Sequence, residues 1–142
     1  MNISAVSQNN FSSAITLLKR NDLPTEDISE MTGLFVLEER GEVVATIALE
    51  HDSSDALLRS LAVSEEKRSN GLGKEMVAFV EDYARKQGLK NIYLLTTTAA
   101  PFFSKRGYQV IGRDNVSEFL KKTSEFSSSC PASATVMKKE LK

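Results

Sequence analysis

The feature that most constrains this sequence is a strand that leads through a glycine-containing turn into a long amphipathic helix. The strand is predicted over residues 56–63, and the turn after it holds Gly71 and Gly73. A helix is predicted over residues 71–87, because apolar side chains recur there at helical spacing. Those side chains are Leu72, Met76, Phe79, Val80 and Tyr83. A strand and a helix in this order predict an α/β arrangement in which the helix packs on a sheet.

The rest of the chain supplies further strands and helices. Apolar alternation and short apolar runs predict strands at residues 3–6, 34–39, 43–50, 91–96, 108–111 and 134–137. Helical spacing predicts helices at residues 10–20, 99–105 and 117–122, and Thr25 has the position of a cap on another short helix. In the strand at 43–50, one face is expected to carry Val43, Ala45, Ile47 and Leu49. This order predicts a single domain over residues 1–142 of the α/β (α+β) class, with a mixed sheet and helices on its faces.

The composition argues against several classes of function. The 142 residues carry a net charge of −1, so no overall basic surface indicates a nucleic-acid or membrane partner. With one histidine, His51, and one cysteine, Cys130, we expect no disulfide within the chain and no metal site. No apolar run reaches the ~20 residues that span a bilayer, and the N-terminus has no signal-peptide pattern. We therefore expect a cytoplasmic protein.

The turn between strand and helix has the properties of an anion site. A helix N-terminus presents unpaired N–H groups and the positive end of the helix dipole. The two glycines let a ligand approach the backbone, and Lys67, Arg68 and Lys74 add positive charge nearby. These features predict a phosphate or diphosphate as the ligand. The alternative is that Gly71 only starts the helix and Gly73 only allows close packing on the sheet.

The spacing Arg68-x-x-Gly71-x-Gly73 resembles the Arg/Gln-x-x-Gly-x-Gly/Ala signature of the GNAT superfamily of N-acetyltransferases. The resemblance implies a twisted, mostly antiparallel sheet of six or seven strands that is splayed in the middle. It implies acetyl-CoA as cosubstrate, with its diphosphate bound by Arg68, Ser69, Asn70, Gly71, Leu72, Gly73 and Lys74. It also implies a bulged strand that pairs with the pantetheine arm and polarises the acetyl carbonyl, here at Leu61, Ala62 and Val63.

A second segment, residues 102–108, resembles the family's Phe-Tyr-x-x-x-Gly-Phe/Tyr stretch beside the CoA thiol. By that resemblance, Phe103 stands where many members carry a tyrosine that protonates the leaving thiolate. Since phenylalanine donates no proton, either another group does so or CoA leaves as a thiolate stabilised by dipoles. Tyr108 is the nearest alternative donor in sequence, although a tyrosine that starts a strand is also an ordinary core residue.

Acetyl transfer to an amine needs a neutral amine, a thioester held close and donors for the developing oxyanion. Glu50 and His51 end one strand and are either candidate bases or solvated strand-end residues. Arg59 and Ser60 lie within the next strand and are expected on opposite faces. An arginine at this place either clamps a substrate carboxylate or forms a structural salt bridge.

The remaining candidate site residues are two threonines at the end of a strand and one cysteine. Thr96 and Thr97 end the strand at 91–96 and either face the cofactor and substrate or form an ordinary turn. Cys130 is either a nucleophile or a buried, inert thiol.

Three stretches narrow the resemblance to a subgroup. Residues 58–63, 94–99 and 129–134 are similar to GNAT proteins labelled arsenic-resistance N-acetyltransferases, which look like relatives of N-acetylglutamate synthase domains. This resemblance implies a small, amino-acid-like amine acceptor, attacked directly in a ternary complex. It also admits a homodimer, since dimers are common in the family. The alternatives are a protein or peptide N-acetyltransferase and a non-catalytic acyl-CoA-binding module.

Overall fold

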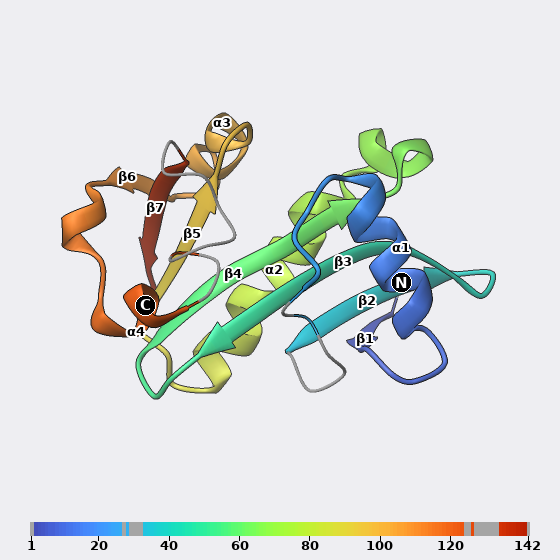
Figure 1. The fold of residues 1–142 in the computed structure, drawn as a ribbon, viewed down its shortest axis with the longest axis horizontal. Helices are drawn as coiled ribbons and strands as arrows, with labels where there is room; N and C mark the ends of the chain where they lie inside the picture. The colour runs from blue at the N-terminus through green and yellow to red at the C-terminus, as the bar shows by residue number, and fades with distance from the viewer. Residues whose placement is uncertain (1, 27, 29–32, 124–125, 127–133, 142) are drawn as a thin grey trace. The chain divides into compact units, whose positions relative to one another are not determined.

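The computed structural model describes residues 2–26, 28, 33–123, 126 and 134–141 (Figure 1). The described strands form one mixed sheet in the order β1-β2-β3-β4-β5-β7-β6. The chain divides into two compact units, which are described separately. The first comprises Met1–Glu50 and Arg59–Tyr83, and the second comprises His51–Leu58 and Ala84–Lys142.

The first unit is an antiparallel sheet with a helix on each face. Its strands are β1 (Ile3–Ala5), β2 (Leu34–Glu39), β3 (Glu42–His51) and most of β4 (Asp55–Val63). Helix α1 (Phe11–Arg20) packs on one face, in a cluster that includes Ala14, Leu18, Leu34, Val36, Ala48 and Ala62. Helix α2 (Leu72–Lys86) covers the other face, where the Phe35 ring meets the rings of Phe79 and Tyr83 edge-on at 5.0 and 5.2 Å.

One face assignment made from the alternation of β3 is wrong. The two-residue turn between β2 and β3 has φ values of 55° at Arg40 and 80° at Gly41, the backbone of a tight hairpin turn. Beyond that turn the register shifts between Leu37 and Glu38, which leaves Val44 as an extra residue. Because a bulge reverses the alternation, Val43 packs in the α1 cluster with Ala48 instead of sharing a face with Ala45.

The described part of the second unit holds the remaining strands, two short α-helices and a 3-10 helix, η2 (Arg113–Asn115). Strand β5 (Asn91–Thr96) runs parallel to the start of β4 and antiparallel to β7 (Thr135–Glu140), which pairs in turn with β6 (Gln109–Ile111). The α-helices are α3 (Ala100–Ser104) and α4 (Glu118–Lys122). The hydrophobic core of this unit includes Leu57, Tyr93, Val116, Leu120 and Val136.

Two turns of this unit follow from local chemistry. Gly88 has a φ of 78°, and the N–H groups of Gly88 and Leu89 bond to the carbonyls of Arg85 and Ala84, which closes the end of α2 as expected for a C′ glycine. Before β4, the Asp52 carboxylate accepts from the N–H groups of Asp55 at 2.7 Å and Ser54 at 2.8 Å. Both bonds stabilise the charged carboxylate and therefore lower the pKa of Asp52, and the bond from Asp55 has the larger effect.

The strands and helices expected from the sequence are present in the described residues, with ends shifted by a few positions. A 3-10 helix, η1 (Glu65–Asn70), was not expected. The short helix expected after Thr25 falls largely outside the described residues. The β4–β5 ladder runs from Asp55 opposite Asn91 to Leu57 opposite Tyr93, and the splay expected beyond it stays a prediction.

Candidate functional site

The turn before α2 presents backbone N–H groups at an open helix end. Helix η1 closes at Gly71, whose φ of 75° lies in the left-handed region that glycine adopts without strain. The first bond that reaches back from α2 runs from the Glu75 N–H to the Gly71 carbonyl, at 3.2 Å. The amides of Leu72, Gly73 and Lys74 therefore belong to the unpaired first turn of the helix.

Two of the three basic side chains near this turn have partners within the protein. Arg68 donates from Nη2 to Asn21 Oδ1 at 2.7 Å and from Nε to the Val63 carbonyl at 3.3 Å. Lys67 pairs with Glu39 at 2.9 Å. Arg68 and Lys67 thus bind other residues of the protein. Lys74 is exposed in the first turn of α2, so its charge lies at the helix end.

A polar cavity of about 290 Å³ lies beside Lys67, and it is not the expected anion site. Its lining comprises Glu39, Arg40, Glu42, Val44, Ser64, Glu66 and Lys67. Three carboxylates against two cations repel a diphosphate, so the backbone amides at the start of α2 remain the part of this unit suited to one.

Strand β4 contains a bulge at Ser60, directly before the three residues expected to meet the acetyl group. Ser60 has a φ of 59°, and its carbonyl accepts a bond from the Thr46 hydroxyl at 2.8 Å. Arg59 Nε donates to Ser60 Oγ at 3.3 Å. The two side chains therefore lie on the same side of the strand, and the expectation of opposite faces is wrong because the bulge interrupts the alternation. Beyond the bulge, Leu61 and Val63 are half-buried and Ala62 is buried in the α1 cluster.

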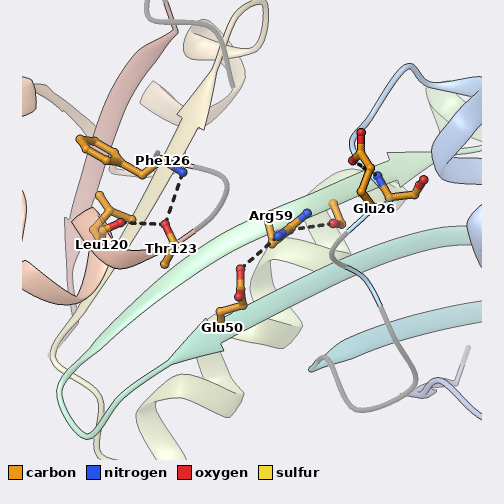
Figure 2. A network of polar contacts seen from close by, with 8 residues as sticks. Glu26, Glu50, Arg59, Leu120, Thr123 and Phe126 are labelled. Atoms are coloured by element: carbon orange, nitrogen blue, oxygen red, sulfur yellow. Dashed lines mark hydrogen bonds and ion pairs between the residues drawn. The ribbon is translucent and has the colours of Figure 1, made fainter. Parts of the chain in front are cut away.

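Glu50 and Arg59, proposed separately from the sequence, form an ion pair in the structure (Figure 2). Arg59 Nη1 lies 3.1 Å from Glu50 Oε2, and the exposed fractions of the side chains are 1% for Arg59 and 32% for Glu50. Each charge thus has a partner, and the carboxylate still reaches solvent. Of the alternatives for Arg59, the salt bridge is present, and the carboxylate clamp stays a prediction. His51 is exposed at the end of β3.

In the second unit, Phe103 and Tyr108 form part of an aromatic stack. Both are buried, and their rings meet edge-on with centroids 5.5 Å apart. The Phe102 and Phe103 rings also meet edge-on, with centroids 5.0 Å apart, and the Arg106 guanidinium lies 4.1 Å from the Phe102 ring centroid. Tyr108 is therefore packed as the core alternative requires, which leaves its proton-donor role untested.

The other candidates of the second unit have mostly structural surroundings. Thr96 Oγ1 accepts from the N–H groups of Thr98 at 3.3 Å and Ala99 at 2.8 Å, so this hydroxyl organises the turn into α3. Thr97 is exposed. Cys130 lies outside the described residues.

The comparisons with known proteins agree on one family. A family model described as an acetyltransferase (GNAT) domain matches residues 30–110. An amino-acid acetyltransferase from Pseudomonas fluorescens is 39% identical over 82 residues, which cover 56% of this chain and 19% of that protein. The chain therefore spans about a fifth of the length of the curated relatives it matches.

Solved structures show the same fold at low sequence identity. N-acetylglutamate synthase from Neisseria gonorrhoeae, complexed with coenzyme A and N-acetyl-glutamate, gives a TM-score of 0.85 at 19% identity, covering 99% of this chain and 35% of that one. Rv2747 from Mycobacterium tuberculosis, solved in a complex with CoA, gives 0.82 at 18% identity and covers 100% of both chains. The seven-stranded sheet is thus the fold of these CoA-bound proteins.

Two features are absent from the described residues. None of the described helices combines the length and apolarity needed to cross a membrane. Within the same residues, no three His, Cys, Asp or Glu side chains gather to hold a metal ion. The expectation of a metal-free reaction stays a prediction.

Proposed function

This chain belongs to the GNAT acetyltransferase domain family, and we propose that it transfers the acetyl group of acetyl-CoA to the primary amine of a small, amino-acid-like acceptor. The observation that carries the proposal is the open first turn of α2, preceded by Gly71 in a left-handed conformation. These amides offer several N–H donors and a positive dipole end to one diphosphate.

The residues after the β4 bulge would hold the other end of acetyl-CoA. The cosubstrate supplies an activated thioester. Backbone N–H groups among Leu61, Ala62 and Val63 would stabilise the oxyanion that develops on its carbonyl. The acceptor nitrogen forms a bond to the carbonyl carbon, the carbon–sulfur bond breaks, and the amine proton passes to a base. CoA leaves as the thiolate and takes up a proton.

Glu50 is the base that we propose, acting through water from the end of β3. Its carboxylate is partly exposed and fixed in direction by Arg59, which favours a defined path for the proton. In this proposal, Arg59 clamps an acceptor carboxylate only if its guanidinium binds that carboxylate and the Glu50 carboxylate at the same time. Tyr108 is the proposed proton donor to CoA, because Phe103 has no hydroxyl to donate.

The amino-acid-like acceptor is supported by the relatives. The matched segment of the Pseudomonas fluorescens protein belongs to an amino-acid acetyltransferase. The contacts of Thr96 and Thr97 with substrate, a cytoplasmic location and a homodimer stay predictions. The arsenic-resistance subgroup also stays a prediction, because the relatives reported above are named as an amino-acid acetyltransferase and an N-acetylglutamate synthase.

A screen of free-CoA release tests the proposal. The purified chain is incubated with acetyl-CoA and one amine at a time: amino acids, polyamines, arsenical or phosphinic amino-acid analogues, and lysine-containing peptides. We expect CoA release with at least one amino acid and formation of the acetylated amine by mass spectrometry. Release with lysine-containing peptides alone would favour a protein acetyltransferase. A melting-temperature increase with acetyl-CoA but no transfer to any amine would favour a binding module.

A further inference from the structure

Thr46, a residue that no sequence pattern singled out, holds the bulge of β4 in place. Its side chain is fully buried, with 0% of its surface exposed, and its hydroxyl donates to the Ser60 carbonyl at 2.8 Å. A buried hydroxyl is costly unless it is hydrogen-bonded. The bond to Ser60 is the reason a hydroxyl is tolerated here.

The Thr46–Ser60 bond lies where an extra residue in β4 shifts its register with β3. At one end of this hairpin the Asp52 N–H bonds to the Asp55 carbonyl, and at the other the Ser64 N–H bonds to the Val44 carbonyl. Between these two bonds β4 has one residue more than β3. Ser60, with its φ of 59°, is that extra residue.

From this geometry we infer that Thr46 is a positioning residue for acetyl transfer, an inference that rests on the proposed function. The Ser60 carbonyl and the Leu61 N–H belong to one planar trans peptide, so they point in opposite directions. A bond that fixes the carbonyl therefore fixes the direction of the Leu61 N–H, one of the proposed donors to the acetyl group. The same bulge brings Ser60 Oγ to Arg59, which orients Glu50.

The test compares Thr46→Val with Thr46→Ser. Valine keeps the shape and removes the hydroxyl, whereas serine keeps the hydroxyl and removes a methyl group. We expect Thr46→Val to lower kcat at least tenfold with little change in KM for acetyl-CoA, and Thr46→Ser to stay within about threefold of the wild type. An undiminished kcat in Thr46→Val would overturn the inference. Equal losses in both variants would also overturn it, because they would show that packing decides.

A second readout does not depend on catalysis. Amide hydrogen exchange at Ser64, whose N–H bonds to the Val44 carbonyl just beyond the bulge, is expected to be at least tenfold faster in Thr46→Val than in the wild type, and close to the wild-type rate in Thr46→Ser. If the wild type transfers no acetyl group but the exchange rates differ as expected, the proposed function fails and the bulge-holding role stands. Unchanged exchange rejects that role. If Thr46→Val does not fold, Thr46→Ala replaces it, since alanine and serine differ only in the hydroxyl.

Discussion

Replacing Gly71 by glutamate separates the ligand-binding role of this turn from its conformational role. Gly71 and Gly41 have nearly equal φ values, 75° and 80°, and a Cβ at either position would have no heavy atom within 4 Å. Gly41→Glu is therefore a matched control with the same charge change and the same backbone strain. Holding a non-glycine residue in this conformation costs about 1–2 kcal/mol. For a chain of this length, that lowers the melting temperature by roughly 3–8 °C in both variants.

The two variants are expected to differ once acetyl-CoA is added. A ligand at about 100 times its Kd stabilises the folded state by about 2.7 kcal/mol, or roughly 8–10 °C for this chain. Gly41→Glu should retain this increase. Gly71→Glu should lose most of it, because its carboxylate lies beside the amides proposed to bind the diphosphate. The assay is differential scanning fluorimetry with and without acetyl-CoA. Equal increases in the two variants would refute the placement of the diphosphate at this turn.

Three further predictions concern single side chains. Glu50→Gln should lower the free energy of unfolding in urea by about 1–2 kcal/mol, since its ion pair with Arg59 is intermediate between exposed and buried. In an Arg59→Met background, the same substitution should lower it by less than about 0.5 kcal/mol. Tyr108→Phe should lower kcat at least tenfold with KM unchanged, and steady-state kinetics with an unchanged kcat would exclude the proton-donor role. The lowered pKa of Asp52 means that its contribution to stability is complete above the ordinary carboxyl pKa and is lost as pH falls through the lower, folded-state value. The difference in urea midpoint between wild type and Asp52→Asn should therefore shrink between about pH 7 and about pH 2.5, and a constant difference would contradict the assignment.

Local patterns in the sequence predicted the order of strands and helices and the glycine that ends α2. Both depend on neighbours a few residues apart: alternation gives a strand, and a left-handed glycine ends a helix. Local patterns could not predict the bulge at Val44, and the bulge in β4 was expected only from the family resemblance, one residue later than Ser60. At Val44 and Ser60 the chain gains one residue relative to its partner strand, and that mismatch depends on pairing between strands.

The same reason explains what was missed in the candidate site. Glu50 and Arg59 were selected individually for their charge, but their contact depends on the β3–β4 hairpin. In the sequence, Thr46 is an ordinary β-branched strand residue. Only its burial and its bond to the Ser60 carbonyl at the bulge show a role for its hydroxyl. The pairing of Arg68 with Asn21 joins residues from distant parts of the chain, so no local pattern could distinguish a scaffold role from a ligand role.

These contacts assign different tasks to the two helices of the first unit. Thr46, Ala48 and Glu50 share one face of β3, because they lie two positions apart along the strand, and Ala48 packs in the cluster with α1. The Thr46–Ser60 bond and the Glu50–Arg59 pair therefore belong to the α1 side of the sheet. The end of α1 also bonds to the turn before α2, through Asn21 and Arg68. In the proposed function the first-turn amides of α2 bind the diphosphate, whereas α1 packs against the strand and bonds to the turn that would hold the ligand. Changes that loosen the packing of α1 should therefore impair acetyl transfer and acetyl-CoA binding together.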